Sequence, residues 1–178
     1  MQVENYIHPL LRDVPDFPKP GIMFKDITPL LADPVARKRV VEDIKTQFIT
    51  QDIQAVAAVE ARGFIFGALL AEALSVPFIP VRKSGKLPYH KIKEEYALEY
   101  GTASIEMHVD AFERGTRVLI HDDLLATGGT SSAAGNLIER LGGVVAGYSF
   151  IINLGFLPGE KNLSERFGVM PHYLITYK

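Results

Sequence analysis

The apolar residues of this chain alternate between a spacing typical of buried strands and a spacing typical of helices. Residues 55–59 form a continuous apolar run, and after a turn at 60–63 an apolar helix is expected over 64–74. Other apolar runs predict strands at 78–81, 117–120, 144–152 and 173–177, and other patterns predict helices at 34–48, 130–141 and 158–167. The alternation predicts an α/β fold, with a mostly parallel twisted sheet flanked by helices and ligands beyond the carboxyl ends of the strands.

Two segments depart from this alternation. Apolar residues from Val3 to Val14 recur at helical spacing around Pro9, which predicts a short, kinked helix followed by an ordered loop or extended arm over 15–26. The polar stretch 82–95 has no period and is expected to be a mobile loop, long enough to act as a lid. Residues 96–109 then alternate as two strands joined near Gly101, which predicts a hairpin outside the parallel core.

The composition limits the classes of function. A chain of 178 residues with 47% hydrophobic residues is expected to be one domain, 1–178, with a substantial core. A net charge of -2 provides no cationic field for nucleic acid or anionic lipid, and we expect neither a signal peptide nor a membrane span. The absence of cysteine excludes disulfides and cysteine nucleophiles and suits a reducing cytoplasm. An anionic ligand must therefore be held by a local site.

The most informative run is VLIHDDLLATGGT, residues 118–130. An apolar strand ends at two acids, Asp122 and Asp123, and a turn rich in glycine and hydroxyl groups opens a helix. The glycines allow the backbone to approach a ligand closely, and the first helical turn offers unpaired amides at the positive end of the helix dipole. The acids are suited to accept hydrogen bonds from sugar hydroxyls or to approach a magnesium ion. A sugar phosphate satisfies both halves of this motif, whereas a Walker lysine and a three-glycine dinucleotide fingerprint are absent.

At this run the sequence resembles the phosphoribosyltransferases, whose signature is an apolar strand, two acids and a threonine-glycine-glycine-threonine loop. Four further segments resemble, in order and spacing, the members of that family that act on adenine: PKPGIMFKDITPLL (19–32), EARGFIFG (60–67), RKSGKLP (82–88) and ALEYGTASIE (97–106). The resemblance covers essentially the whole chain. It implies the type I fold of that family, with a small N-terminal hood over 1–32 and a flexible lid and hairpin over 82–109.

The resemblance also implies an activity and its partners. The expected reaction is purine salvage, in which adenine displaces pyrophosphate from phosphoribosyl pyrophosphate and AMP is formed. Mg²⁺ is the implied cofactor, held mainly by the substrate and by no direct side-chain ligation, and a cytoplasmic homodimer is the implied form of the protein.

Individual site residues follow from the same resemblance. The 5-phosphate is expected on the loop Ala126, Thr127, Gly128, Gly129 and Thr130, and the ribose hydroxyls on Asp122 and Asp123. Pyrophosphate is expected on Arg62, whose guanidinium presents a fork of donors, and on Arg82 and Lys86 of the lid. The adenine pocket is expected around Met23, Phe24 and Lys25, and Glu99 is the expected general acid/base, catalytic together with Arg62.

Two positions depart from the family pattern and keep alternatives open. His121 replaces an aliphatic residue before the acids and is expected to be a packed, neutral side chain, and Asn153 stands where relatives often have glutamate. A phosphoribosyltransferase for another purine, xanthine or guanine, is one alternative, and a non-catalytic sensor of phosphoribosyl pyrophosphate is another. The other histidines show no metal-binding spacing: His8, His90, His108 and His172.

Overall fold

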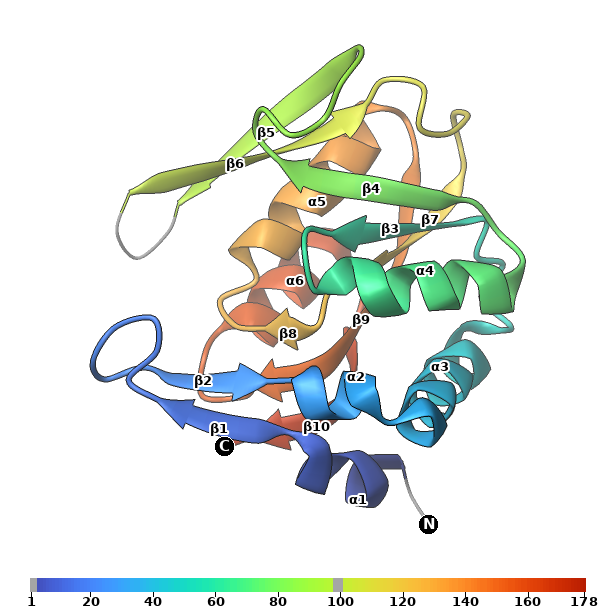
Figure 1. Ribbon diagram of the computed structural model, residues 1–178. Helices are drawn as coiled ribbons and strands as arrows, with labels where there is room; N and C mark the ends of the chain where they lie inside the picture. The colour runs from blue at the N-terminus through green and yellow to red at the C-terminus, as the bar shows by residue number, and fades with distance from the viewer. Residues whose placement is uncertain (1–2, 98–100) are drawn as a thin grey trace.

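The computed structural model describes residues 3–97 and 101–178 and places one sheet at the centre of the molecule (Figure 1). Its strands follow the order β10-β9-β7-β3-β4-β6-β5, with the short β8 beside β9. The parallel strands are β3 (Ala55–Val59), β4 (Phe78–Lys83), β7 (Arg117–His121), β8 (Leu124–Leu125), β9 (Val144–Leu154) and β10 (His172–Tyr177). The predicted, mostly parallel α/β sheet is confirmed.

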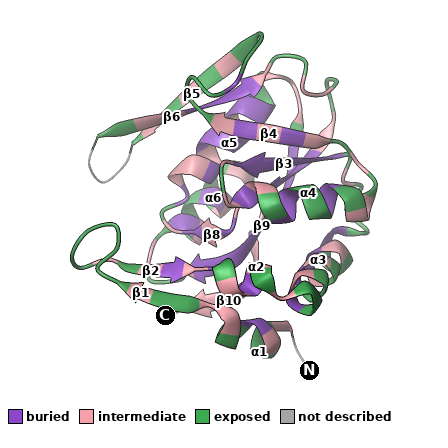
Figure 2. Ribbon diagram, in the orientation of Figure 1, coloured by how far each residue is buried: buried purple, intermediate pink, exposed green. Residues whose placement is uncertain are grey.

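Helices cover both faces of this sheet, as a parallel sheet requires. One face packs against α5 (Gly129–Arg140) and α6 (Gly159–Phe167), and the other against α3 (Pro34–Phe48) and α4 (Gly63–Leu74). All five residues of β3 are buried, which explains their continuous apolar run (Figure 2). The residues of α3 that face the core repeat at helical spacing: Ala36, Val40, Ile44 and Phe48.

The start of α3 shows why that helix could be predicted from sequence. The Asp33 carboxylate accepts hydrogen bonds from the amides of Val35 (2.8 Å) and Ala36 (3.0 Å), and Pro34 occupies the first turn. Helix α3 has 15 residues. Within 3–97 and 101–178, no helix is both long enough and apolar enough to cross a bilayer.

The N-terminal segment differs from its prediction. Helix α1 (Val3–Ile7) is followed by a short 3-10 turn, η1 (His8–Leu10), and the predicted continuation to Val14 is wrong. Instead β1 (Arg12–Pro15) pairs with β2 (Met23–Asp26) as an antiparallel hairpin, before a short helix, α2 (Thr28–Ala32). Pro9 lacks the amide that would continue the helix, and the pairing of Arg12 with Asp26 joins residues that periodicity cannot relate.

The hairpin at the other end of the molecule also differs in its bounds. β5 (Lys91–Ala97) pairs antiparallel with β6 (Thr102–His108), and β6 pairs antiparallel with β4 at the edge of the sheet, so the predicted hairpin outside the parallel core is confirmed. The irregular segment is 84–90 rather than 82–95, because β4 extends to Lys83 and β5 begins at Lys91. The sequence of β5 lacks a clear apolar-polar alternation because one inward position holds a charged residue, Glu94. Its carboxylate accepts hydrogen bonds from Asn136 and Arg140 of α5.

Candidate active site

The two acids lie where β7 ends. The Asp122 amide donates to the Ser149 carbonyl of β9 (3.2 Å), and the Asp123 amide donates to Asp122 Oδ1 (2.9 Å). The Asp123 carbonyl accepts from the amides of Ile151 and Ile152, so the neighbouring strand β9 holds both acids in place. Burial raises the pKa of both carboxyls, and the charge of Asp123 raises that of Asp122 further. Such carboxylates favour a ligand that brings hydroxyl donors.

A close approach of α4 defines one wall of the site. A methyl group on Gly63 would lie 3.0 Å from Asp122 Oδ1 and 3.1 Å from the Asp122 Cα atom. The turn at 60–63 therefore reaches the acids only because position 63 lacks a side chain.

The loop after the acids forms a small cavity at the start of α5. Gly128 has a φ of 81°, a left-handed conformation that favours glycine, and directly precedes the helix. The cavity is about 80 Å³ and is lined by Asp122, Leu124, Leu125, Ala126, Thr127, Gly128, Gly129, Thr130 and Ser131. Unpaired amides at a helix start above such a cavity suit a phosphate. All five predicted residues of the 5-phosphate loop line it.

Helix α6 supports this loop from behind, a role that the sequence interpretation missed. The Asn162 side-chain amide donates to the Thr127 carbonyl (2.9 Å), and a methyl group on Gly159 would collide with the Ala126 carbonyl. The sequence signal for this packing is the Pro158-Gly159 pair at the start of the helix.

Arg62 joins the acids to the N-terminal hairpin. Its Nε lies 2.9 Å from Asp123 Oδ2, and its Nη1 donates to the Lys25 carbonyl (3.2 Å). The guanidinium also lies over the Phe24 ring, 4.6 Å from its centroid. The structure thus brings together three segments that were predicted separately to bind pyrophosphate, ribose and base.

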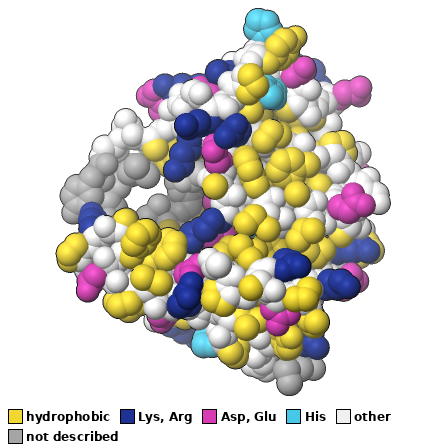
Figure 3. All heavy atoms as spheres, in the orientation of Figure 1, with side chains coloured by type: hydrophobic (Ala, Val, Ile, Leu, Met, Phe, Trp, Pro, Cys, Tyr) yellow, Lys and Arg dark blue, Asp and Glu magenta, His cyan; other side chains and the backbone are white. Residues whose placement is uncertain are grey.

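The lid cations lie beside the same turn. Arg82 donates to both carboxylate oxygens of Glu60 (3.2 and 2.9 Å) and through Nη1 to the Lys86 carbonyl (2.7 Å). The bond to Arg82 lowers the pKa of Glu60, and the same bond raises that of Arg82. The Lys86 side chain is exposed. Lys and Arg side chains gather on this face between the β1–β2 hairpin and the end of β4 (Figure 3).

The expected base segment, Met23 to Lys25, is strand β2. Successive side chains of a strand point to opposite faces, and Phe24 faces Arg62. The Lys25 ammonium is directed elsewhere: it donates to Asp13 (2.6 Å) and lies 3.7 Å from the centroid of the Tyr177 ring. The carbonyl of Lys25, rather than its side chain, therefore lies on the side of Arg62, and Met23 is half exposed.

The predicted acid/base Glu99 lies outside the described residues. The described residues that precede it reach the 126–130 loop, since a methyl group on Gly129 would lie 3.4 Å from Tyr96 Cδ2 and 3.5 Å from the Ala97 carbonyl. The end of β5 and the start of α5 are therefore neighbours.

Comparison with known proteins agrees with this arrangement. Residues 31–152 match the phosphoribosyl transferase domain family. The sequence is 56% identical over 167 residues to an adenine phosphoribosyltransferase of Nitrosococcus oceani. The aligned residues cover 94% of this chain and 96% of the relative. The chain belongs to the adenine phosphoribosyltransferase family.

Solved structures of that family share the whole fold. The crystal structure of adenine phosphoribosyltransferase from Rhodothermus marinus superposes with a TM-score of 0.93 at 48% identity, covering 98% of both chains. The Saccharomyces cerevisiae enzyme, complexed with adenine and an imino-altritol bisphosphate, superposes with a TM-score of 0.87 at 35% identity, covering 96% of both chains.

His121 is a packed side chain, as expected from the sequence. It is fully buried, with Nδ1 2.9 Å from Ser149 Oγ and its ring edge-on to Phe66. Burial lowers the pKa of His121 to about 3, so the ring is neutral at physiological pH. Asn153 is 2% exposed in β9 and pairs in register with Thr176 of β10 and Leu125 of β8.

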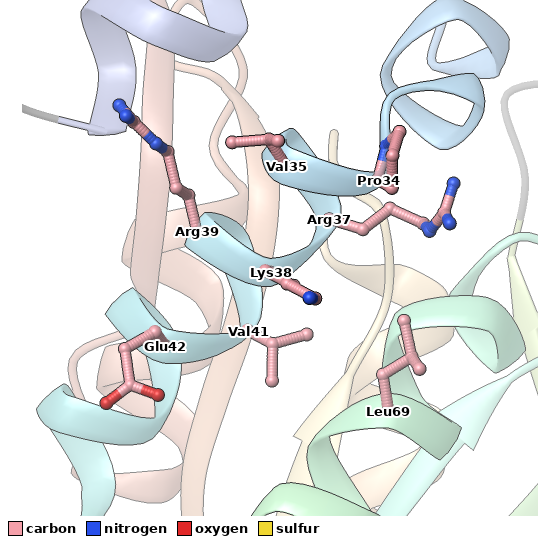
Figure 4. A pocket seen from close by; sticks show the side chains of 8 residues that line it. All are labelled: Pro34, Val35, Arg37, Lys38, Arg39, Val41, Glu42 and Leu69. Carbon is pink, nitrogen blue, oxygen red and sulfur yellow. The ribbon is translucent and has the colours of Figure 1, made fainter.

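A larger cavity lies away from these residues. It has a volume of about 640 Å³ between α3 and α4, where Val41 and Leu69 face each other (Figure 4). Its lining contains none of the residues that the family signature indicates: Pro34, Val35, Arg37, Lys38, Arg39, Val41, Glu42 and Leu69. The residues that the signature indicates for the 5-phosphate line the smaller cavity at the start of α5 instead.

Proposed function

We propose that this protein transfers the phosphoribosyl group of phosphoribosyl pyrophosphate to adenine, releasing pyrophosphate and forming AMP in purine salvage. Relatives that carry the name adenine phosphoribosyltransferase support it over nearly the full chain. The observation that carries it is the meeting of Arg62 with Asp123 beside the 126–130 loop, since one activated sugar phosphate would contact all three.

The sugar end of the substrate fits the loop and the acids. The 5-phosphate would accept hydrogen bonds from amides of Gly128 and Gly129 and from the Thr130 hydroxyl. The ribose hydroxyls would donate to Asp122 and to Asp123, whose Oδ2 is buried and pairs with Arg62 Nε (2.9 Å). These contacts would fix the anomeric carbon before reaction.

The cations on the opposite side suit the leaving group. In an oxocarbenium-like transition state, negative charge grows on the departing pyrophosphate, where Arg62, Arg82 and Lys86 would stabilise it. Arg82 is paired with Glu60. It would contact pyrophosphate either through N–H donors that Glu60 does not use or by releasing Glu60 and binding pyrophosphate in its place. Closure of the lid over this site would exclude water that hydrolyses the activated sugar.

The base would bind beside the β2 strand. The main chain at Met23 is suited to read the exocyclic amine, and the Phe24 ring offers an apolar face for the purine. Glu99 would share the proton of the adenine nitrogen that attacks the sugar.

The acids also fit a magnesium ion that arrives with the substrate. Asp122 and Asp123 provide carboxylate oxygens, which are the ligand type that Mg²⁺ prefers. Within residues 3–97 and 101–178, no group of three His, Asp or Glu side chains could hold a metal alone, so substrate oxygens would complete the coordination. When bound, the ion would neutralise charge on the pyrophosphate.

We further propose a cytoplasmic homodimer. Helix α4 buries Phe66 and Leu70 against the sheet while Ile65 and Leu69 remain 40% and 39% exposed, and apolar side chains gather over α4 in Figure 3. These exposed residues support a contact with a second copy. The absence of cysteine supports a reducing compartment.

The deciding experiment measures magnesium-dependent consumption of phosphoribosyl pyrophosphate with adenine, guanine, hypoxanthine and xanthine offered separately. AMP from adenine alone, with a sharp loss in Glu99→Gln, is expected. Turnover of an oxopurine in preference to adenine would retain the sugar-phosphate site and overturn the base assignment. Binding of the activated sugar without turnover of any base would identify a sensor.

A further inference from the structure

Glu106 is a buried carboxylate to which the family signature assigns no chemistry. It lies on β6, in register with Arg82 of β4 on one side and Lys93 of β5 on the other, and is 5% exposed. A buried carboxylate is costly unless hydrogen bonds compensate its lost hydration, so its partners indicate what it holds in place.

The partners of Glu106 come mainly from the turn that follows β4. Oε1 accepts from the Ser84 hydroxyl (3.0 Å), and Oε2 accepts from the Gly85 amide (3.1 Å) and lies 3.6 Å from Lys91 Nζ. Burial alone would raise the pKa of Glu106, but the bonds from Gly85, Ser84 and Lys91 bring it below its ordinary value. The carboxylate is therefore ionised and fully engaged with this turn.

The same turn carries the cations of the pyrophosphate site. It closes through the Lys86 amide, which donates to the Lys83 carbonyl (3.1 Å), and Gly85 has a φ of 80°. The Lys86 carbonyl then accepts from Arg82, which also donates to Glu60 of the 60–63 turn. A continuous set of hydrogen bonds thus leads from Glu106 to the turn that bears Arg62.

Besides this anchor, the turn is held by the bond from the Lys86 amide to the Lys83 carbonyl and by the bond from Arg82 to the Lys86 carbonyl. Ser84, Gly85 and Lys86 are all exposed. The neighbouring buried residue, Leu87, fixes one end of the segment, and the Ser84 amide, which donates to the Ser104 carbonyl (3.0 Å), fixes the other. Between these ends the carboxylate adds two bonds, from the Ser84 hydroxyl and from the Gly85 amide.

We propose that Glu106 is a positioning residue that fixes the 84–86 turn, so that Arg82 and Lys86 are presented to pyrophosphate. This inference rests on the proposed function. The proposal predicts a change in anion affinity opposite to that expected from charge. Removal of a negative charge near an anion site should strengthen anion binding through electrostatics alone, whereas loss of the anchor should weaken it.

The test compares Glu106→Gln with Glu113→Gln, an exposed glutamate before β7 at the opposite end of the strands. In Glu106→Gln, the dissociation constant of magnesium pyrophosphate, measured by calorimetry, is expected to rise about tenfold, the loss of one charge-assisted hydrogen bond. The KM for phosphoribosyl pyrophosphate should rise in parallel, while the KM for adenine and AMP binding stay within about twofold. Glu113→Gln should match the wild type.

Pyrophosphate binding that is unchanged or tighter in folded Glu106→Gln would overturn the proposal. If that variant does not fold, Ser84→Ala removes one donor from an exposed position, and a rise of about threefold in the pyrophosphate dissociation constant is expected; no rise overturns the proposal. Wild-type protein that binds pyrophosphate but converts no purine contradicts the proposed function only, because the binding comparison remains valid.

Discussion

Arg62 Nε lies 2.9 Å from Asp123 Oδ2, and this pair connects the end of β7 to the start of α4. Asp123 is buried, and Arg62 is about one-third exposed, so the arginine has donors left for a ligand while it holds the acid. One salt bridge thereby links the acids after β7 to the turn that precedes α4.

The pair predicts a loss of activity when the charge of Asp123 is removed. Asp123→Asn retains the shape of the side chain but weakens both the bond to Arg62 and the acceptor for ribose, so kcat/KM for phosphoribosyl pyrophosphate should fall about 10- to 100-fold. Steady-state kinetics measures this, with Asp110→Asn at an exposed position as the control. Equal rates in the two variants would remove Asp123 from the site.

Two glycines of α4 should separate activity from stability. Gly63→Ala places a methyl group against Asp122, and a displaced acid should lower kcat/KM about 10- to 100-fold with little change in melting temperature. Gly67→Ala instead makes the helix collide with Ala58 of β3 and should lower the melting temperature strongly. The prediction fails if Gly63→Ala melts early or keeps full activity.

His121 predicts a pH dependence of stability. Burial holds its pKa at about 3 in the folded protein against 6.5 when unfolded, so unfolding takes up a proton below pH 6.5. The free energy of unfolding should therefore fall as the pH decreases from 6.5 toward 3, by up to about 1.4 kcal/mol per pH unit from this group. In His121→Leu this component should vanish.

Chemical denaturation at several pH values measures the difference between His121→Leu and the wild type. His90, an exposed histidine, provides the matched control, because His90→Gln should leave the slope unchanged. Parallel slopes in wild type and His121→Leu would show that His121 does not remain neutral in the folded protein.

The exposed face of α4 predicts an effect on assembly. Leu69→Lys introduces a charge where a second copy is proposed to pack, so light scattering should report the mass of a monomer for the variant and of a dimer for the wild type. Met170→Lys, at a residue 65% exposed elsewhere, should remain dimeric. A dimeric Leu69→Lys variant would place the interface on another surface.

Local patterns made much of this molecule predictable. The acids and the 126–130 loop are contiguous in the chain, so a strand, a turn and a helix start suffice to place them together. The Asp33 cap and the buried stripe of α3 are likewise set by residues within one helix. Periodicity failed at β5, where Glu94 occupies an inward position because its partners lie on α5, and at β1, whose partner strand begins eight residues after β1 ends.

The sequence by itself determined the α/β order of elements and the sugar-phosphate motif, because both depend on neighbours along the chain. Only the tertiary structure decided that Arg62 meets Asp123, that its guanidinium covers Phe24, and that Glu106 holds the 84–86 turn. These contacts join residues separated by 21 or more positions, and they follow from the register of paired strands and from the close packing of α4 on the sheet. A local hydrophobic period cannot predict these contacts, because the residues come together only once the sheet has formed.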